Sequence, residues 1–121
     1  KLELPKDQVI TDGNIEVYVQ DGISNEMATS LAAYLKKNID PQQKISFQVI
    51  QNADGYYVIS MVTKKDMVDT VSEEEMNTIA GKISKDILYG AGLTFQLTDE
   101  EFMPYRKVQY NITHVDSTPV Q

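Results

Sequence analysis

The sequence predicts an α+β domain of the ferredoxin-like βαββαβ class, with two helices on one face of a four- or five-stranded antiparallel sheet. Strand-type and helix-type patterns follow one another in the order β-α-β-β-α-β. Residues 24–51 also align without a gap with residues 72–99. Identical pairs in this alignment include Ser24 with Ser72, Phe47 with Phe95 and Gln48 with Gln96. We interpret the match as an internal duplication, which predicts a pseudo-twofold relation between the halves. Right-handed crossovers are expected to place both helices on the same face.

The first half is predicted to contain a strand, a helix and a second strand after a polar segment. In order, these are a linker or lead-in over residues 1–13, a strand over 15–20, a helix after Ser24 and a strand over 45–49. In both strands apolar and polar side chains alternate, which is typical of strands with one buried face. Serine is a common N-cap. We expect the helix to end at Asp40-Pro41 because proline disfavours helical backbone in the residue before it.

The second half repeats this order after a turn. The expected elements are a turn over residues 52–55, a strand over 56–63, a loop over 64–71, a helix after Ser72, a strand over 93–97 and a returning strand over 105–112. Asn, Asp and Gly in the turn tolerate the left-handed backbone of tight hairpins. Ser72 and Glu75 have the spacing of a capping box. We therefore assign residues 14–112 to a single domain and expect residues 113–121 to form a frayed tail.

Composition excludes several classes of function. The chain has 121 residues, a size typical of one domain, and a formal net charge of −7. That charge argues against nucleic acid and against electrostatic docking on anionic lipid, because both need clustered basic residues. The absence of cysteine excludes disulfides and thiolate metal sites. No apolar run approaches the ~20 residues of a membrane span. Because the chain opens at Lys1 rather than methionine, we expect membrane association only through an N-terminal anchor missing from this sequence.

No catalytic residue, cofactor or metal site is predicted. His114 is the single histidine, and it has no acidic or nucleophilic partner near it in the sequence, so we interpret it as a surface residue. Asp99, Glu100 and Glu101 form an acidic cluster in a predicted turn. A hydrolase that uses these carboxylates is the least favoured function, because acid–base catalysis needs one carboxyl group shielded from water. Asn111-Ile112-Thr113 fits a glycosylation sequon, a motif that is common by chance.

The open face of the predicted sheet is the main candidate for a binding surface. If the alternating apolar side chains point at the helices, the opposite face carries Glu16, Tyr18, Gln20, Ser46, Gln48, Ile50, Thr94, Gln96 and Thr98, with Val58 and Val62 as an apolar centre. Such a surface suits contact with a partner. The same residue types also occur on the solvated face of ordinary antiparallel sheets. The partner-binding candidates are Tyr18, Gln48, Val62 and Gln96.

Several short motifs carry a resemblance to a known family. These are the run from Ile15 to Ser24, then Phe47-Gln48-Val49, Asp54-Gly55-Tyr56-Tyr57 and Val62-Thr63-Lys64-Lys65. Over residues 15–108 the chain resembles an uncharacterised family of bacterial extracytoplasmic or membrane-anchored domains, with recurring "VYYTDGV-S/T", "VQL", "D-G-x-Y" and "V-V-K-K" motifs. It departs from that family at Thr98-Asp99, where relatives often carry Cys-Asp, and in the long loop at 64–71. The resemblance implies a small, non-catalytic domain displayed near a membrane by a preceding segment.

Two functional hypotheses follow. The first is a non-catalytic binding or interaction domain of unknown ligand, located outside the bacterial cytoplasm in the cell envelope or periplasm, that uses the open sheet face. The alternative is a structural module that forms homo-oligomers through sheet pairing, because the same apolar centre would also support self-association.

Overall fold

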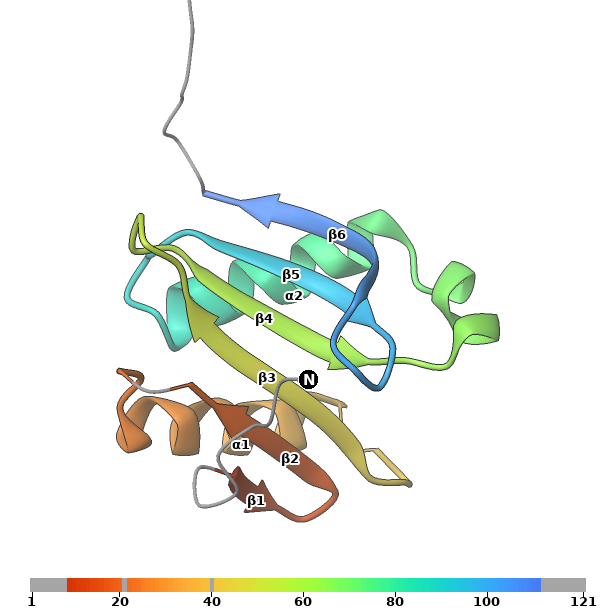
Figure 1. Ribbon diagram of the computed structural model, residues 1–121, viewed down its shortest axis with the longest axis horizontal. Coiled ribbons are helices and arrows are strands. Elements are labelled where there is room, and N and C mark those ends of the chain that lie inside the picture. Colours follow the sequence, from red (N-terminus) through yellow and green to blue (C-terminus); the bar gives the residue numbers. More distant parts are fainter. Residues whose placement is uncertain (1–8, 21, 40, 112–121) are drawn as a thin grey trace, which may run out of the picture.

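The computed structural model of the protein describes residues 9–20, 22–39 and 41–111, and these form one mixed sheet with two α-helices packed on it (Figure 1). The strands are β1 (Val9–Asp12), β2 (Ile15–Val19), β3 (Ile45–Gln51), β4 (Tyr57–Val62), β5 (Leu93–Thr98) and β6 (Pro104–Tyr110). The helices are α1 (Asn25–Ile39), the 3-10 helix η2 (Lys65–Thr70) and α2 (Glu73–Asp86). Each helix and strand expected from the sequence is present, and β1 and η2 are additional.

The six strands lie in the sheet in the same order as in the chain, β1-β2-β3-β4-β5-β6. The hairpin neighbours β1–β2, β3–β4 and β5–β6 are antiparallel. The pairs joined by an α-helix, β2–β3 and β4–β5, are parallel. The sheet is therefore made of two βαβ units side by side, with one antiparallel hairpin strand at each outer edge.

The predicted ferredoxin-like architecture, with its four- or five-stranded antiparallel sheet, is wrong. In that architecture the two βαβ units interleave, whereas here each unit pairs its own two strands. The cause lies in the outer hairpins. β1 occupies the outer edge of β2 through a turn in which Gly13 adopts a φ of 63°, and β6 occupies the outer edge of β5. β2 and β5 each retain one free edge. β3, which follows α1, pairs with the free edge of β2, and β4, which precedes α2, pairs with that of β5.

The predicted internal duplication is not supported either. The strands of the β2–α1–β3 unit run opposite to those of β4–α2–β5, while both units advance the same way across the sheet and both helices lie on one face. Two such units necessarily have opposite hands. In Figure 1 the β4–α2–β5 crossover is right-handed and the β2–α1–β3 crossover is left-handed, although about 98% of such crossovers are right-handed. No rotation superposes units of opposite hand, so the matched residues reflect shared helix and strand patterning.

The core lies between the helices and one face of the sheet. Strand register places Val17 opposite Phe47 and Ile59 opposite Phe95 on this face. Both phenylalanines are 0% exposed. α1 packs against β1 and β2, and α2 packs against β5 and β6. The helices add buried apolar side chains to the same cluster, among them Leu31, Leu35, Met76 and Ile83.

The local signals in the sequence are confirmed at atomic level. The Ser72 hydroxyl accepts a hydrogen bond from the Glu75 N–H at 3.0 Å, and the Glu75 carboxylate accepts one from the Ser72 N–H at 2.9 Å. This is the expected capping box of α2. Ser24 Oγ accepts from the Met27 N–H at 3.1 Å at the start of α1. Among the described residues, no helix is long and apolar enough to cross a membrane.

Arg106 joins β6 to η2. Its Nη1 atom donates a hydrogen bond to the carbonyl oxygen of Val68 at 3.0 Å and a second, shorter one to that of Val71. These carbonyls lie at the end of a 3-10 helix, and that of Val68 also accepts from the Val71 N–H at 3.5 Å. One guanidinium group therefore holds the 65–71 segment against the edge of the sheet. The sequence pattern indicated only a loop there.

Replacement of Ser72 tests the capping box. We expect Ser72→Ala to lower the free energy of unfolding by about 0.5–2 kcal/mol, because the Glu75 N–H loses its side-chain acceptor. Ser30→Ala is the matched control, since Ser30 is exposed within α1 and alanine favours helix interiors. Chemical denaturation of the three proteins measures the difference. Equal midpoints for wild type and Ser72→Ala would contradict the role given to this cap.

Replacement of Arg106 tests the link between β6 and η2. Arg106→Ala removes the side-chain donor shared by the Val68 and Val71 carbonyls and should cost about 1–3 kcal/mol of stability. Arg106→Lys retains the charge but not the planar fork, so we expect it to recover only part of the loss. Hydrogen exchange should rise selectively in residues 65–71. Unchanged exchange in that segment would show that Arg106 does not hold it.

A candidate binding surface on the open face of the sheet

Three of the four predicted partner-binding residues lie in a single row across the open face of the sheet, the face turned away from the helices. Strand register places Tyr18 opposite Gln48, Gln48 opposite Ser60, and Ser60 opposite Gln96. Val62, the fourth, lies two residues beyond Ser60 on β4 and is opposite Thr98. The structure thus brings these residues together on one surface, as the alternation pattern predicted.

The centre of this row is polar and internally paired. Gln96 Nε2 donates a hydrogen bond to Ser60 Oγ at 2.9 Å, and Ser60 is only 1% exposed. A buried hydroxyl needs such a partner because burial without one is costly. Serine in a mostly apolar strand gives no distinctive pattern, so Ser60 could not be singled out from the sequence. Gln96 is therefore committed to a contact within the sheet.

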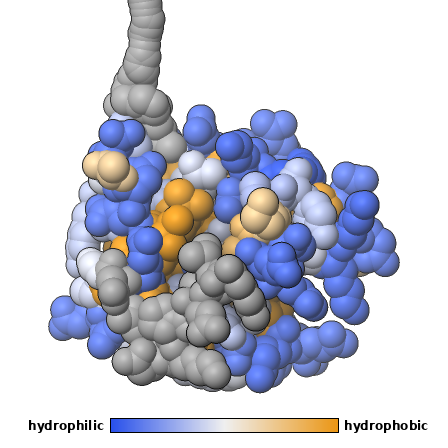
Figure 2. Space-filling view, viewed as in Figure 1, coloured by the Kyte–Doolittle hydropathy of each residue, from blue (hydrophilic) through white to orange (hydrophobic). Residues whose placement is uncertain are grey.

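Beside this row lies a small apolar area. Ile50 lies opposite Val58, and Val58 lies opposite Thr94, so these side chains share the open face. Figure 2 shows apolar surface on this face with hydrophilic side chains around it. All three residues are half-buried. An apolar centre with a polar rim is the common composition of a protein-binding surface.

The turn between β5 and β6 extends over the open face. Figure 1 shows it in front of the end of β4, on the side of the sheet away from the helices. Asp99 Oδ1 accepts hydrogen bonds from the N–H groups of Glu101 at 2.8 Å and Met103 at 2.9 Å, which holds the turn in shape. Phe102 has a φ of 63° and its ring packs edge-on against Tyr18, with centroids 5.9 Å apart. The turn of β5–β6 therefore contacts β2 across two intervening strands.

This contact forms one side of a cavity of about 410 Å³. The residues that line the cavity are Tyr18, Lys44, Ile45, Ser46, Val62, Glu100 and Phe102. Its size falls within the roughly 300–1,000 Å³ of small-ligand sites. Lys44 forms an ion pair with Glu16 at 3.3 Å, and the Ser46 hydroxyl donates to the same carboxylate at 3.1 Å. The cavity thus combines aromatic and aliphatic walls with the hydroxyl groups of Tyr18 and Ser46 and charges of both signs.

The predicted candidates divide into two groups at this site. Tyr18 and Val62 line the cavity, whereas Gln48 and Gln96 lie in the adjoining row. Phe102 is a functional candidate that the sequence analysis missed. The available signal was a lone aromatic residue inside an acidic turn, between Glu101 and Met103. A large aromatic side chain in an otherwise solvated turn indicates that its ring packs against another part of the protein.

The acidic cluster considered for a hydrolase lies mostly outside this cavity. Asp99, Glu100 and Glu101 border a separate hollow together with Lys64 and Lys65. Asp99 is engaged with the backbone of its own turn, and Glu100 and Glu101 are exposed. Within the described ranges, no three His, Cys, Asp or Glu side chains are grouped as metal ligands. His114 and the sequon residue Thr113 lie outside the described residues.

Comparison with known proteins gives one match. A family model described as AF_1994_N, family N-terminal domain, matches residues 8–110, which include all six strands and both α-helices. No curated protein and no solved structure matches the chain. The expectation of an uncharacterised domain family is confirmed, while its description names neither bacteria nor an extracytoplasmic location. The chain therefore belongs to the AF_1994_N family of N-terminal domains, whose function is uncharacterised.

Proposed function

We propose that the domain is a non-catalytic binding module that holds a protein partner on the open face of its sheet. The observation that carries this proposal is the contact between Phe102 and Tyr18. A non-glycine residue with positive φ has a conformational cost on the order of 1 kcal/mol. Phe102 bears that cost while its ring helps to enclose a cavity over the open face. Local strain of this kind is concentrated at binding sites.

The composition of the cavity favours a protein segment as its occupant. Phe102, Tyr18 and Val62 supply apolar contact, and Ser46 supplies a hydroxyl. A partner would insert an apolar side chain between the rings and pair its polar groups with the rim, where Lys44 and Glu100 lie. The acidic net charge of −7 continues to argue against nucleic acid as the partner.

The setting of the module is part of the same proposal. The strand, cap and turn motifs that resemble bacterial extracytoplasmic domains support a location in the cell envelope or periplasm. The matching family is described as an N-terminal domain, which supports a role as one module of a longer protein. A fusion to a reporter active only outside the cytoplasm would test this location.

Self-association through sheet pairing is the second candidate. Among the described residues, no strand pairs with the outer edge of β6, and Tyr105 and Tyr110 on this strand are 41% and 38% exposed. Exposed strand edges can pair with another chain. However, β6 begins with Pro104 and carries Arg106 and Lys107, residue types that protect edges against pairing. We therefore rank it below binding at the open face.

Replacement of Val62 tests the proposed binding surface. We expect Val62→Glu to weaken the affinity for a partner at least about tenfold, or roughly 1.4 kcal/mol, because it places a carboxylate at the cavity beside Glu100. Its stability should change by no more than about 1 kcal/mol, since Val62 is only half-buried. The partner is first captured from native extract with the wild-type domain, purified, and then titrated against each variant.

The matched control is Thr29→Glu, which adds the same charge at an exposed position of α1 on the opposite side of the sheet. It should bind as the wild type does. Equal affinities for wild type and Val62→Glu would remove the open face from consideration.

A further inference from the structure

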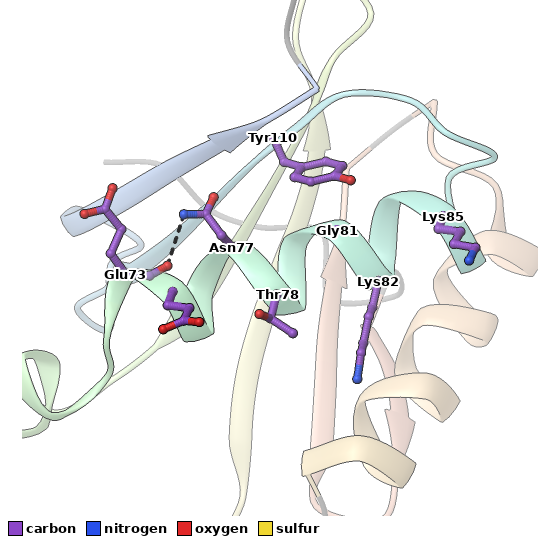
Figure 3. Close-up of a pocket in the computed structure, with 8 residues that line it drawn as sticks. Glu73, Asn77, Thr78, Gly81, Lys82, Lys85 and Tyr110 are labelled. Atoms are coloured by element: carbon purple, nitrogen blue, oxygen red, sulfur yellow. Dashed lines mark hydrogen bonds between the residues drawn. The ribbon is translucent and has the colours of Figure 1, made fainter.

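A shallow, open hollow, referred to below as the groove, lies on the outer face of α2, away from the open face of the sheet. Seven of the residues that line it come from α2 and one from β6: Glu73, Glu74, Asn77, Thr78, Gly81, Lys82, Lys85 and Tyr110. Its volume is about 700 Å³. Figure 3 shows Glu73 toward one end of the helix and Lys85 toward the other, with the Tyr110 ring over the middle.

Gly81 allows the Tyr110 ring to lie against α2 and to form one side of this groove. A Cβ atom at Gly81 would lie 3.1 Å from Tyr110 Cε1 and 3.2 Å from Cζ, so the tyrosine ring rests on the helix backbone. Glycine within a helix costs about 1 kcal/mol relative to alanine. The close contact offsets part of this cost and positions an aromatic ring, 38% exposed, beside the helix.

The charges along the groove are arranged so that the surface complements itself. Glu74 precedes Thr78 by four residues, and Lys82 follows Thr78 by four residues. If two copies of α2 lie antiparallel about a twofold axis near Thr78, Glu74 faces the partner's Lys82 and Lys82 faces the partner's Glu74. Both contacts form because an isologous interface repeats each pair. The helix dipole favours acids at the start and lysines at the end of α2, and the spacing of four residues puts Glu74, Thr78 and Lys82 on one side of the helix.

The shape of the helix surface fits the same arrangement. A further hollow beside the groove is lined by Glu74, Glu75, Thr78 and Ile79. Glu74 and Thr78, both exposed, border both hollows. Helices pack when the ridges of one enter the grooves of the other.

We propose that a second copy of this chain occupies the groove, forming an antiparallel α2–α2 dimer centred on Thr78. A second copy fits better than a foreign acidic or basic partner, because Glu73 and Glu74 balance Lys82 and Lys85 within the groove. The dimer leaves both open sheet faces free, so it is independent of the binding role proposed above.

Sedimentation velocity of the full chain, over a range of concentrations and at low and high salt, tests this dimer. We expect a monomer–dimer equilibrium that weakens as salt increases, because exposed ion pairs are screened. Lys82→Glu and Glu74→Lys should each raise the dimer dissociation constant at least about tenfold, since each creates two like-charge contacts. The double variant Glu74→Lys/Lys82→Glu should restore the dimer.

Two features of these variants exclude a change in helix stability or in net charge as the cause of the expected result. The double variant places both charges against the helix dipole, so its α2 is the least stable and recovery of the dimer cannot come from a firmer helix. Lys37→Glu, an equal change of charge at an exposed position of α1, should leave the dissociation constant within about twofold. Circular dichroism verifies that each variant is folded.

The outcomes that overturn the dimer are distinct. A monomer at all concentrations overturns it and leaves a foreign partner as the occupant of the groove. A dimer whose dissociation constant is unchanged by both single charge reversals overturns it in favour of pairing through β6. Failure of the double variant to recover association, with its fold intact, also overturns it.

Discussion

The two outer hairpins are the constraint on which the rest of the sheet depends. β1 covers one edge of β2, and β6 covers one edge of β5, so each inner strand can accept only one further neighbour. The first hairpin is held by α1, because the aliphatic stem of Lys36 lies against Gly13 and its ammonium group pairs with Asp12 at 3.4 Å. The second is held by the Asp99 carboxylate within its turn. Strand order, crossover pairing and the extent of the open face all follow from these edges.

Local structure was predictable because it depends on neighbours in the sequence. The alternation around Val17 and Phe47 and the Ser72–Glu75 box depend on spacings of two and three residues, and both are correct in the structure. Topology depends on which edges meet, and the element order β-α-β-β-α-β is common to interleaved and side-by-side units. The four residues of β1 fell in a polar segment that gave little sign of a strand. That short strand changes the arrangement of the whole sheet.

The candidate site was predictable only in part, for a related reason. Alternation assigns a side chain to a face of a strand, so Tyr18, Gln48, Val62 and Gln96 were placed on one surface. No periodicity describes a turn that folds over a sheet, and so the position of Phe102 could not be deduced. Likewise, the sequence around Gly81 predicts only a less stable helix, and the Tyr110 ring that lies against this glycine comes from a distant strand. Contacts between segments distant in the sequence define both surfaces.

Because every strand lies beside the one that precedes it, no pairing in the sheet joins strands that are more than one connection apart in the chain. Three of the five pairings are between hairpin neighbours, and the other two span only a single helix-containing connection. In an interleaved arrangement, the first strand could not complete its pairing until the last strand was available. Folding rates rise as the mean sequence separation of contacts falls. Each new strand can therefore pair with a neighbour that has already been synthesised.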